Sequence, residues 1–359
     1  MKLRLAGMAG LFVVLALTGC DKSSDETTEV RRELPDWMSD GEGTASTGSD
    51  SPFGDAPSAE LKLQLNPGDR FPLRKVVRQE LTQSTLSGQP DVSYSQLEIM
   101  FAISVEEVQS DRVKLAVRYD RVKYQHNVAG EAVYFDSTSP PAVVPIGVRA
   151  YRDMVGDGFK FWLGQDNRIV DVEGFTDFLQ RCTRDVPEEM RSAVMLGMEA
   201  GSGEDGIANF VDNSIGLLPY GVAQKPGDMW ERPRYVSRPI PMQIQNQYTL
   251  QELTDSEAVV AIRGNISAGN VGEASSDSAQ VQVTGGSTQG TCTIYRKTGL
   301  PKASQVERVV NMVVHMPTAE FRQQKRVSTT IESFPVVSGG SVMQVGFDQP
   351  AGLQGNYRQ

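Results

Sequence analysis

The chain has 359 residues and a net charge of −10, with 35 Lys and Arg against 45 Asp and Glu. Residues 21–60 alone hold eleven acidic and three basic side chains, a net charge of −8. Binding to nucleic acid requires a basic stripe that displaces counterions. The sequence contains no such stripe, so we expect no nucleic-acid partner.

The first twenty residues have the pattern of a bacterial lipoprotein signal. Lys2 and Arg4 form a positive n-region, and the apolar run of residues 5–17 is too short for a comfortable membrane span. The segment ends in a lipobox, in which small residues precede a cysteine whose thiol carries a diacylglycerol. The lipobox residues are Leu17, Thr18 and Gly19, followed by Cys20.

We therefore expect residues 1–19 to be a signal peptide and Cys20 to be lipidated. Its acyl chains would be the membrane partner, anchoring the chain to a bacterial envelope membrane with the body in the periplasm. Residues 20–60 are polar and acidic with few large apolar groups, which predicts a disordered tether.

Strand patterns begin after residue 60. Alternating leucines at positions 61–65, residues 71–82, 97–105 and 113–122, and the pair 159–163 and 169–172 all indicate strands. These elements predict a first β-meander over residues 61–172.

The middle of the chain, residues 173–218, predicts a helical insert. Apolar residues recur three to four apart in residues 174–181 and 187–199, and a third short helix is expected over residues 204–214.

The strands resume in residues 219–335, which predict a second β-meander. Residues 104–118 align without gaps with residues 249–263, and a Pro-Gly-Asp turn precedes each block. The predicted fold is therefore α+β and β-rich: two related antiparallel β-meanders, forming curved sheets, with a central helical insert. Hairpin patterns shared without duplication are the alternative. Residues 336–359 are expected to be a flexible C-terminal tail.

Two cysteines remain in the body, Cys182 and Cys292. In an exported protein an even pair favours a disulfide. Two separate buried thiols are the alternative that the sequence leaves open.

No pattern in the sequence indicates a catalytic residue, a metal site or a cofactor. Residues 201–206 match G-x-G-x-x-G, but they follow a helical pattern and contain acidic side chains, which favours a linking loop. His126 and His315 lie in strand-like segments without other ligands nearby, so we expect cross-strand polar residues.

The chain resembles an uncharacterised family of bacterial envelope lipoproteins of the planctomycete type. The resemblance covers roughly residues 61–335 and rests on the lipobox, the Pro-Gly-Asp turns, residues 205–220 and residues 290–301. It implies no activity and no catalytic residue. The expected fold also has a loose analogy to periplasmic lipoprotein carriers.

These patterns predict a non-enzymatic, membrane-anchored lipoprotein that offers a binding or interaction surface. The occupant would be an envelope protein or an apolar ligand. The alternative is a carboxylate-dependent hydrolase acting on an envelope polymer, whose two carboxylates would meet only in the fold.

Overall fold

A computed structural model describes residues 58–84, 89–128, 131–197, 211, 215–236, 240–269, 280–316 and 319–334. Fourteen strands and three helices lie in this part of the chain. The strands are β1 (Ala59–Glu60), β2 (Arg70–Gln83), β3 (Asp91–Val108), β4 (Arg112–Val128), β5 (Glu131–Asp136), β6 (Gly158–Gly164), β7 (Ile169–Glu173), β8 (Ala223–Gln224), β9 (Met229–Val236), β10 (Met242–Leu253), β11 (Glu257–Ala268), β12 (Gln280–Tyr295), β13 (Pro301–Met316) and β14 (Ala319–Ser333).

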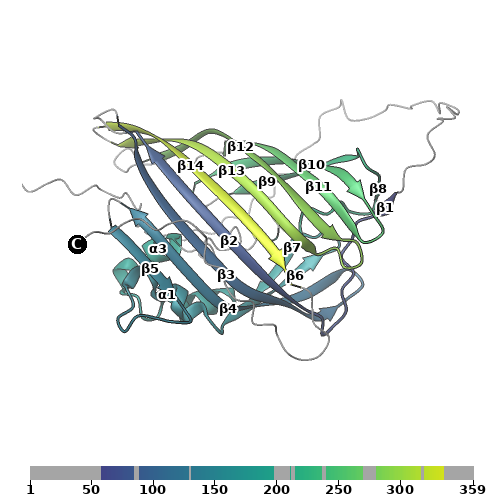
Figure 1. The fold of residues 1–359 in the computed structure, drawn as a ribbon, viewed down its shortest axis with the longest axis horizontal. Coiled ribbons are helices and arrows are strands. Elements are labelled where there is room, and N and C mark those ends of the chain that lie inside the picture. Colours follow the sequence, from purple (N-terminus) through teal and green to yellow (C-terminus); the bar gives the residue numbers. More distant parts are fainter. Residues whose placement is uncertain are drawn as a thin grey trace, which may run out of the picture.

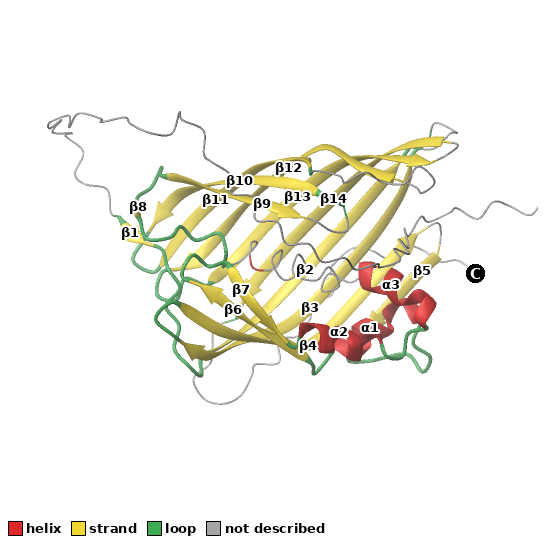
Figure 2. Ribbon diagram, turned by 180° about the vertical axis from the view of Figure 1, so that it is seen from behind, coloured by secondary structure: helices red, strands yellow, loops and turns green. Residues whose placement is uncertain are grey.

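Twelve of these strands form one antiparallel sheet. Its order is β7-β6-β4-β3-β2-β14-β13-β12-β11-β10-β9, and β5 pairs with β4 beside that path. The sheet is long and curved, so that β6 and β7 lie below β9 and β10 with the interior between them (Figures 1 and 2). The two short strands β1 and β8 pair separately.

The sheet has two halves, and in both the strands follow one another across the sheet in the same order along the chain. The first half is β7-β6-β4-β3-β2, the second half is β13-β12-β11-β10-β9, and β14 joins them by pairing with β2 and β13. The two expected meanders are therefore parts of one continuous sheet.

The two halves use matching turns and bulges. In the first half the Gly68 N–H donates to the Val105 carbonyl oxygen over 2.8 Å. At the matching place in the second half, the Gly227 N–H donates to the Leu250 carbonyl oxygen over 2.7 Å. The pairing of β3 with β4 shifts register just after Val105, and that of β10 with β11 shifts just after Leu250.

Three helices pack on the first half: α1 (Ile146–Met154), α2 (Phe175–Thr183) and α3 (Glu188–Gly197). They cover the lower part of the sheet's inner side (Figure 2). Helices α1 and α2 turn a buried face toward the strands, which in α2 includes Phe175, Phe178 and Cys182. We call the resulting buried cluster the helix-covered core.

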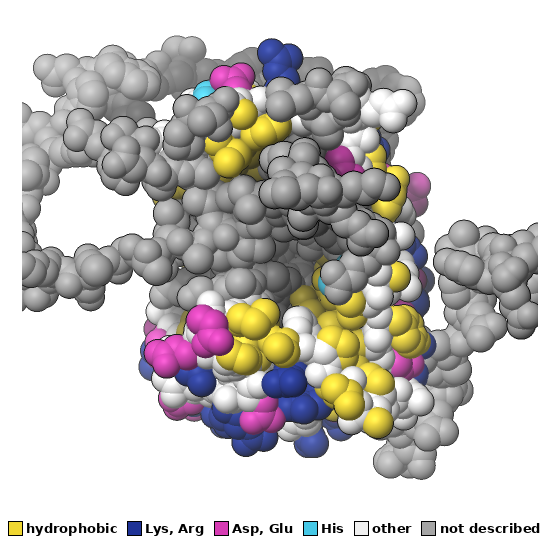
Figure 3. All heavy atoms as spheres, turned by 90° about the vertical axis from the view of Figure 1, so that its left-hand side faces the viewer, with side chains coloured by type: hydrophobic (Ala, Val, Ile, Leu, Met, Phe, Trp, Pro, Cys, Tyr) yellow, Lys and Arg dark blue, Asp and Glu magenta, His cyan; other side chains and the backbone are white. Residues whose placement is uncertain are grey.

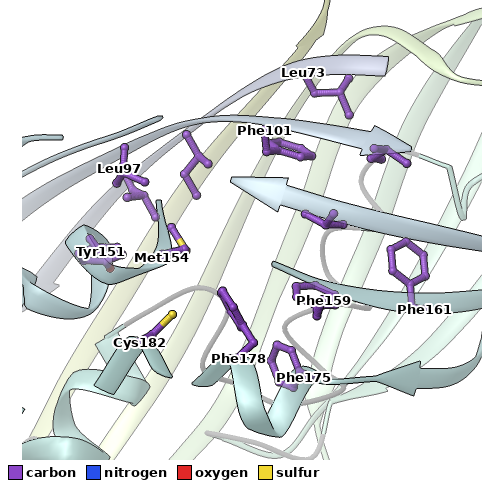
Figure 4. Close-up of a cluster of buried hydrophobic side chains, with 14 of the residues drawn as sticks. Leu73, Leu97, Phe101, Tyr151, Met154, Phe159, Phe161, Phe175, Phe178 and Cys182 are labelled. Carbon is purple, nitrogen blue, oxygen red and sulfur yellow. The ribbon is translucent and has the colours of Figure 1, made fainter. Parts of the chain in front are cut away.

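Aromatic rings pack against one another within this helix-covered core (Figure 4). Tyr119 of β4 stacks on Phe178 of α2 with ring centroids 5.6 Å apart, and Phe159 lies 5.6 Å from the same ring. Tyr124 of β4 stacks on Tyr151 of α1 at 4.8 Å. These contacts fix the two helices against the sheet, since an aromatic pair adds about 0.5–1.5 kcal/mol beyond its buried area.

The structure confirms a β-rich, antiparallel fold and corrects several elements. The helical segment is minor, and helix α1 lies inside the range that predicted only strands. Helix α1 is short and directly follows a proline-rich segment, so the helical spacing of its apolar residues was hard to recognise in the sequence. Residues 61–69 do not form the strand that their alternating leucines predicted, although Leu61 and Leu65 are buried. The third expected helix lies largely outside the described residues.

Candidate ligand-binding site

The inner face of the second half carries two separate apolar clusters. The first, the loop-covered cluster, packs Tyr248, Leu250 and Ile262 against Leu217 and Leu218 from the segment before β8. The second, the end cluster, lies further along the same strands. Its buried residues are Val236, Ile244, Ile266, Val283, Val310 and Met312.

The end cluster differs from the other two in what packs on it. All of its buried members belong to strands β9 to β13, and within the described residues no helix contacts it. Figure 3 looks along the sheet from the end where β5 and α3 lie, and shows hydrophobic side chains gathered at the top and at the bottom of that end. The inner face of the second half is thus apolar at a place where the first half is covered by helices.

A row of polar positions crosses the sheet between the two clusters. The row follows the strand register from β9 to β13, each position being paired with the next. On one side it adjoins Tyr248 and Ile262 of the loop-covered cluster, and on the other Ile244 and Ile266 of the end cluster. We call it the polar row; its positions are Arg232, Asn246, Gly264, Thr288 and Arg308.

Two uncharged side chains of the polar row are buried with an unpartnered atom, and the Nε atom of Arg308 at the end of the row is also buried without a hydrogen-bond partner. Asn246 is 8% exposed and Thr288 is 3% exposed. The Asn246 amide nitrogen donates to the Tyr248 hydroxyl over 3.3 Å, but neither its oxygen nor the Thr288 hydroxyl has a hydrogen-bond partner. Each such group costs about 1–3 kcal/mol when it stays unpaired. Most buried polar groups are satisfied, so these two call for an explanation.

Gly264 lies between them and contributes no side chain. A Cβ there would stand 2.3 Å from the Asn246 Oδ1 atom and 2.8 Å from the Gln245 carbonyl oxygen. The Asn246 amide therefore leans over Gly264, toward the strand that carries Thr288.

A small pocket of about 300 Å³ lies at the edge of the same half. It sits between the β6–β7 turn, the segment before β8 and the edge strand β9. Trp230 in its wall stacks on Tyr248 with centroids 5.8 Å apart, so the pocket adjoins the polar row. The lining residues are Asp166, Arg168, Pro219, Tyr220, Val222, Gln224, Trp230, Glu231 and Arg232.

Arg232 connects the two ends of the curved sheet beside this pocket. Its guanidinium donates to the Asp166 carbonyl oxygen over 2.8 Å and also to the Leu218 carbonyl oxygen. The Tyr220 hydroxyl donates to the Gln165 side chain over 2.5 Å in the same place. The pocket is thus built from both edges of the sheet, β7 with its turn and β9.

Three carboxyls of the described residues have a lowered pKa. Burial raises the pKa of Asp136, but hydrogen bonds from Thr138 and Arg121 outweigh it and bring the value to about 2. Hydrogen bonds from Arg181 to Asp157, and from Lys114 to Glu173, lower the pKa of those carboxyls. These three carboxyls belong to ion pairs with Arg121, Arg181 and Lys114.

The structure does not contain the disulfide that the sequence favoured. Cys182 and Cys292 are both free and buried, Cys182 in the helix-covered core and Cys292 in the loop-covered cluster. Burial raises the pKa of each thiol to about 12. The thiols act as small apolar side chains of two different cores, which explains why they do not pair.

The other sequence-derived positions fall into two groups. Leu17, Thr18, Gly19, Cys20 and the glycine-rich residues 201–206 lie outside the described residues. His126 contacts the Tyr124 hydroxyl at 3.2 Å and His315 lies 3.3 Å from Glu320, so both are strand residues with polar neighbours.

Neither a metal-ligand cluster nor a long membrane helix is found in the part of the chain described. No group of three His, Cys, Asp or Glu side chains there is placed to hold a metal ion. None of the described helices has the length and apolarity required to cross a bilayer.

Comparison with solved structures gives only distant likeness. Lipovitellin, in a structure of its lipid–protein interactions, matches at 12% identity and a TM-score of 0.41 over 78% of this chain and 27% of its own. An outer membrane channel from Pseudomonas putida F1 matches at 9% identity and a TM-score of 0.19, over 79% of this chain and 100% of its own. The chain thus spans about a quarter of lipovitellin, and no functional argument follows from scores this low.

Comparison of the sequence is more informative about kinship. No curated protein sequence matches the chain. The model of a family of unknown function, DUF6263, matches residues 110–301. This match spans β4 to the start of β13, and leaves out β2 and β3 of the first half. Because it covers more than half of the chain, the protein belongs to the DUF6263 family.

Proposed function

We propose that this protein is a lipid-anchored, non-enzymatic protein of the bacterial envelope that binds an apolar or amphipathic small molecule on the inner face of its second half. The observation that carries the proposal is the end cluster. Among the residues that the structure describes, its buried members all come from strands, whereas the other half of the sheet is covered by helices.

The energetic argument favours a molecule with an acyl chain. Each methylene removed from water contributes about 0.8 kcal/mol, so ten methylenes contribute roughly 8 kcal/mol before the entropic cost of binding. The end cluster offers Val, Ile and Met side chains, with Leu81, Met242 and Val281 packed at its border. Flexible methionines adapt to ligands of varied shape.

The anchor is part of the proposal and rests on the sequence. Leu17, Thr18 and Gly19 before Cys20 match the lipobox, and the polar residues that follow would separate the body from the membrane. Kinship with envelope lipoproteins of the planctomycete type belongs to the same proposal. An acyl-anchored binder would collect and release its ligand without leaving its membrane.

We also propose that the two halves are related units, one of which retains a binding face. Matching turns at Gly68 and Gly227, and matching bulges after Val105 and Leu250, support this relation.

Native mass spectrometry of the full-length protein, purified from its membrane, tests the proposed function. We expect a small molecule that remains bound under native conditions and is lost on denaturation. A mass without adduct, unchanged after the protein is offered long-chain acyl compounds, would contradict the proposal.

A further inference from the structure

We propose that the polar row binds the hydroxylated head group of the ligand. The ligand is then an uncharged amphiphile with a polyol head, such as an acylglycerol, whose acyl chain lies on the end cluster. This inference rests on the proposed function, which it makes more specific.

The first argument is the chemistry of the two unpartnered groups. The Asn246 Oδ1 atom accepts a hydrogen bond and the Thr288 hydroxyl both donates and accepts. A ligand hydroxyl can donate to the first and accept from the second, whereas a carboxylate offers acceptors only. Both groups are neutral, so they favour a neutral head group.

The charged neighbours do not change this expectation. Arg232 donates to two carbonyl oxygens, those of Asp166 and Leu218. Arg308, at the far end of the row, has an interaction of its own, but its buried Nε atom lacks a hydrogen-bond partner. A ligand hydroxyl can accept from that Nε–H, and the uncharged atoms left for a ligand are the Asn246 amide oxygen and the Thr288 hydroxyl.

The second argument is spacing. Asn246 and Thr288 are separated by one strand, so their backbones lie about 10 Å apart. The Asn246 amide shortens this gap because it leans over Gly264. Two hydroxyls on neighbouring carbons of a glycerol or sugar can reach one group each across the space above Gly264.

The third argument is the contrast with the first half. The hairpin positions that match Asn246 and Gly264 are Phe101 and Tyr119, which also pair with each other. In the first half the Tyr119 ring stacks on Phe178 of α2. The second half has an amide and a glycine where the first half has the two rings that seat a helix. Where the first half packs a helix side chain against its rings, the second half therefore presents hydrogen-bonding groups instead.

The test uses the full-length protein in an amine-oxide detergent, which carries no hydroxyl. Binding of 1-monooleoylglycerol and of methyl oleate, which has the same chain without the diol, is measured by native mass spectrometry. We expect the glycerol compound to bind roughly tenfold more tightly, a difference typical of a satisfied buried hydrogen bond. Monooctadecyl glucoside distinguishes a sugar head from a glycerol head.

Two variants and one control locate the effect. Thr288→Val and Asn246→Ala should each weaken 1-monooleoylglycerol binding about tenfold and leave methyl oleate unchanged. Thr291→Val, on the exposed outer side of the same strand, is the matched control and should change neither. Because the Thr288 hydroxyl is unpartnered without ligand, Thr288→Val should also melt at the parent temperature or above, which a structural hydroxyl would not allow.

The outcomes separate the two proposals. Equal binding of both oleates, unaffected by Thr288→Val, overturns the head-group site and leaves the apolar binding function in place. Preference for oleic acid over 1-monooleoylglycerol overturns the neutral head group. Absence of binding to every acyl compound overturns the proposed function and this inference with it.

Discussion

The two halves of the sheet share a strand plan and differ in what lies on it. In the first half, Phe101 and Tyr119 pair across β3 and β4, their rings contact each other, and Tyr119 stacks on Phe178 of α2. In the second half, the matching pair is Asn246 and Gly264. One half is a conventional aromatic core, and the other presents a polar row between two apolar clusters.

This difference shows that equivalent backbone hydrogen bonds do not determine how a sheet face is used. The turns at Gly68 and Gly227 and the bulges beside Val105 and Leu250 set the same local path in both halves. The side chains that follow decide whether the face holds a helix or remains lined by strands. Substitutions at matched positions of the two halves test this difference.

The largest expected difference comes from truncating the matched pair Phe101 and Asn246. Phe101→Ala should lower the free energy of unfolding by about 3–5 kcal/mol, because it removes a ring that is 4% exposed from the helix-covered core. Asn246→Ala should change it by less than about 1 kcal/mol, since one end of the amide is unpartnered. Urea unfolding of the two variants measures both, and equal losses would remove the proposed contrast.

Acid should weaken the first half through Asp136. Its pKa is lowered from 3.8 to about 2 in the fold, so its stabilising contribution is complete above about pH 4 and is lost as the pH falls through 2. The contribution is up to about 2 kcal/mol. Urea unfolding from pH 6 to pH 2 should show Asp136→Asn less stable than the parent at pH 6 and equal to it at the acid end. A constant difference at all pH values would contradict the assigned ion pair.

A methyl group at Gly264 tests the geometry of the second half. Gly264→Ala places a Cβ against the Asn246 amide and the Gln245 backbone, and should destabilise the protein by about 1–2 kcal/mol. The Gly264→Ala, Asn246→Ala double variant should recover part of that loss, because the amide contact at 2.3 Å is then absent. Thermal melting measures the coupling, and strictly additive losses would place the Asn246 amide elsewhere.

The smallest effect is expected at the two cysteines, one in each half. Cys182 and Cys292 should not react with iodoacetamide in the native protein at pH 8, because burial raises the pKa of both thiols to about 12. In denaturant without reductant, intact mass should show both thiols alkylated. Protection of the pair in denaturant would instead reveal a disulfide.

Much of the sheet could be predicted from alternating apolar residues. Residues 97–105 and 113–122 gave β3 and β4 their core positions, and the gapless alignment located the matching hairpin of the second half. The continuous sheet could not be predicted, because the pairing of β2 with β14 joins strands far apart in the sequence. Helix α1 was not predicted, because its nine residues contain only two buried side chains larger than valine, Tyr151 and Met154.

The candidate site was missed because its residues look ordinary in a strand. Asn246 and Thr288 are single polar residues among alternating apolar ones, and Gly264 suggests only a kink. The aligned blocks, residues 104–118 and 249–263, stop just short of both decisive positions. An extension of three residues before and one residue after would have set Phe101 against Asn246 and Tyr119 against Gly264.

The most direct test of the contrast between the halves is to map where an acyl chain lies. The full-length protein is irradiated with a monoacylglycerol whose acyl chain carries a diazirine, and the modified peptides are identified by mass spectrometry. We predict adducts on the strands of the end cluster, in β10 and β13 around Ile244 and Val310. Adducts confined to the helix-covered core around Phe178, or spread equally over both halves, would contradict a binding face in the second half.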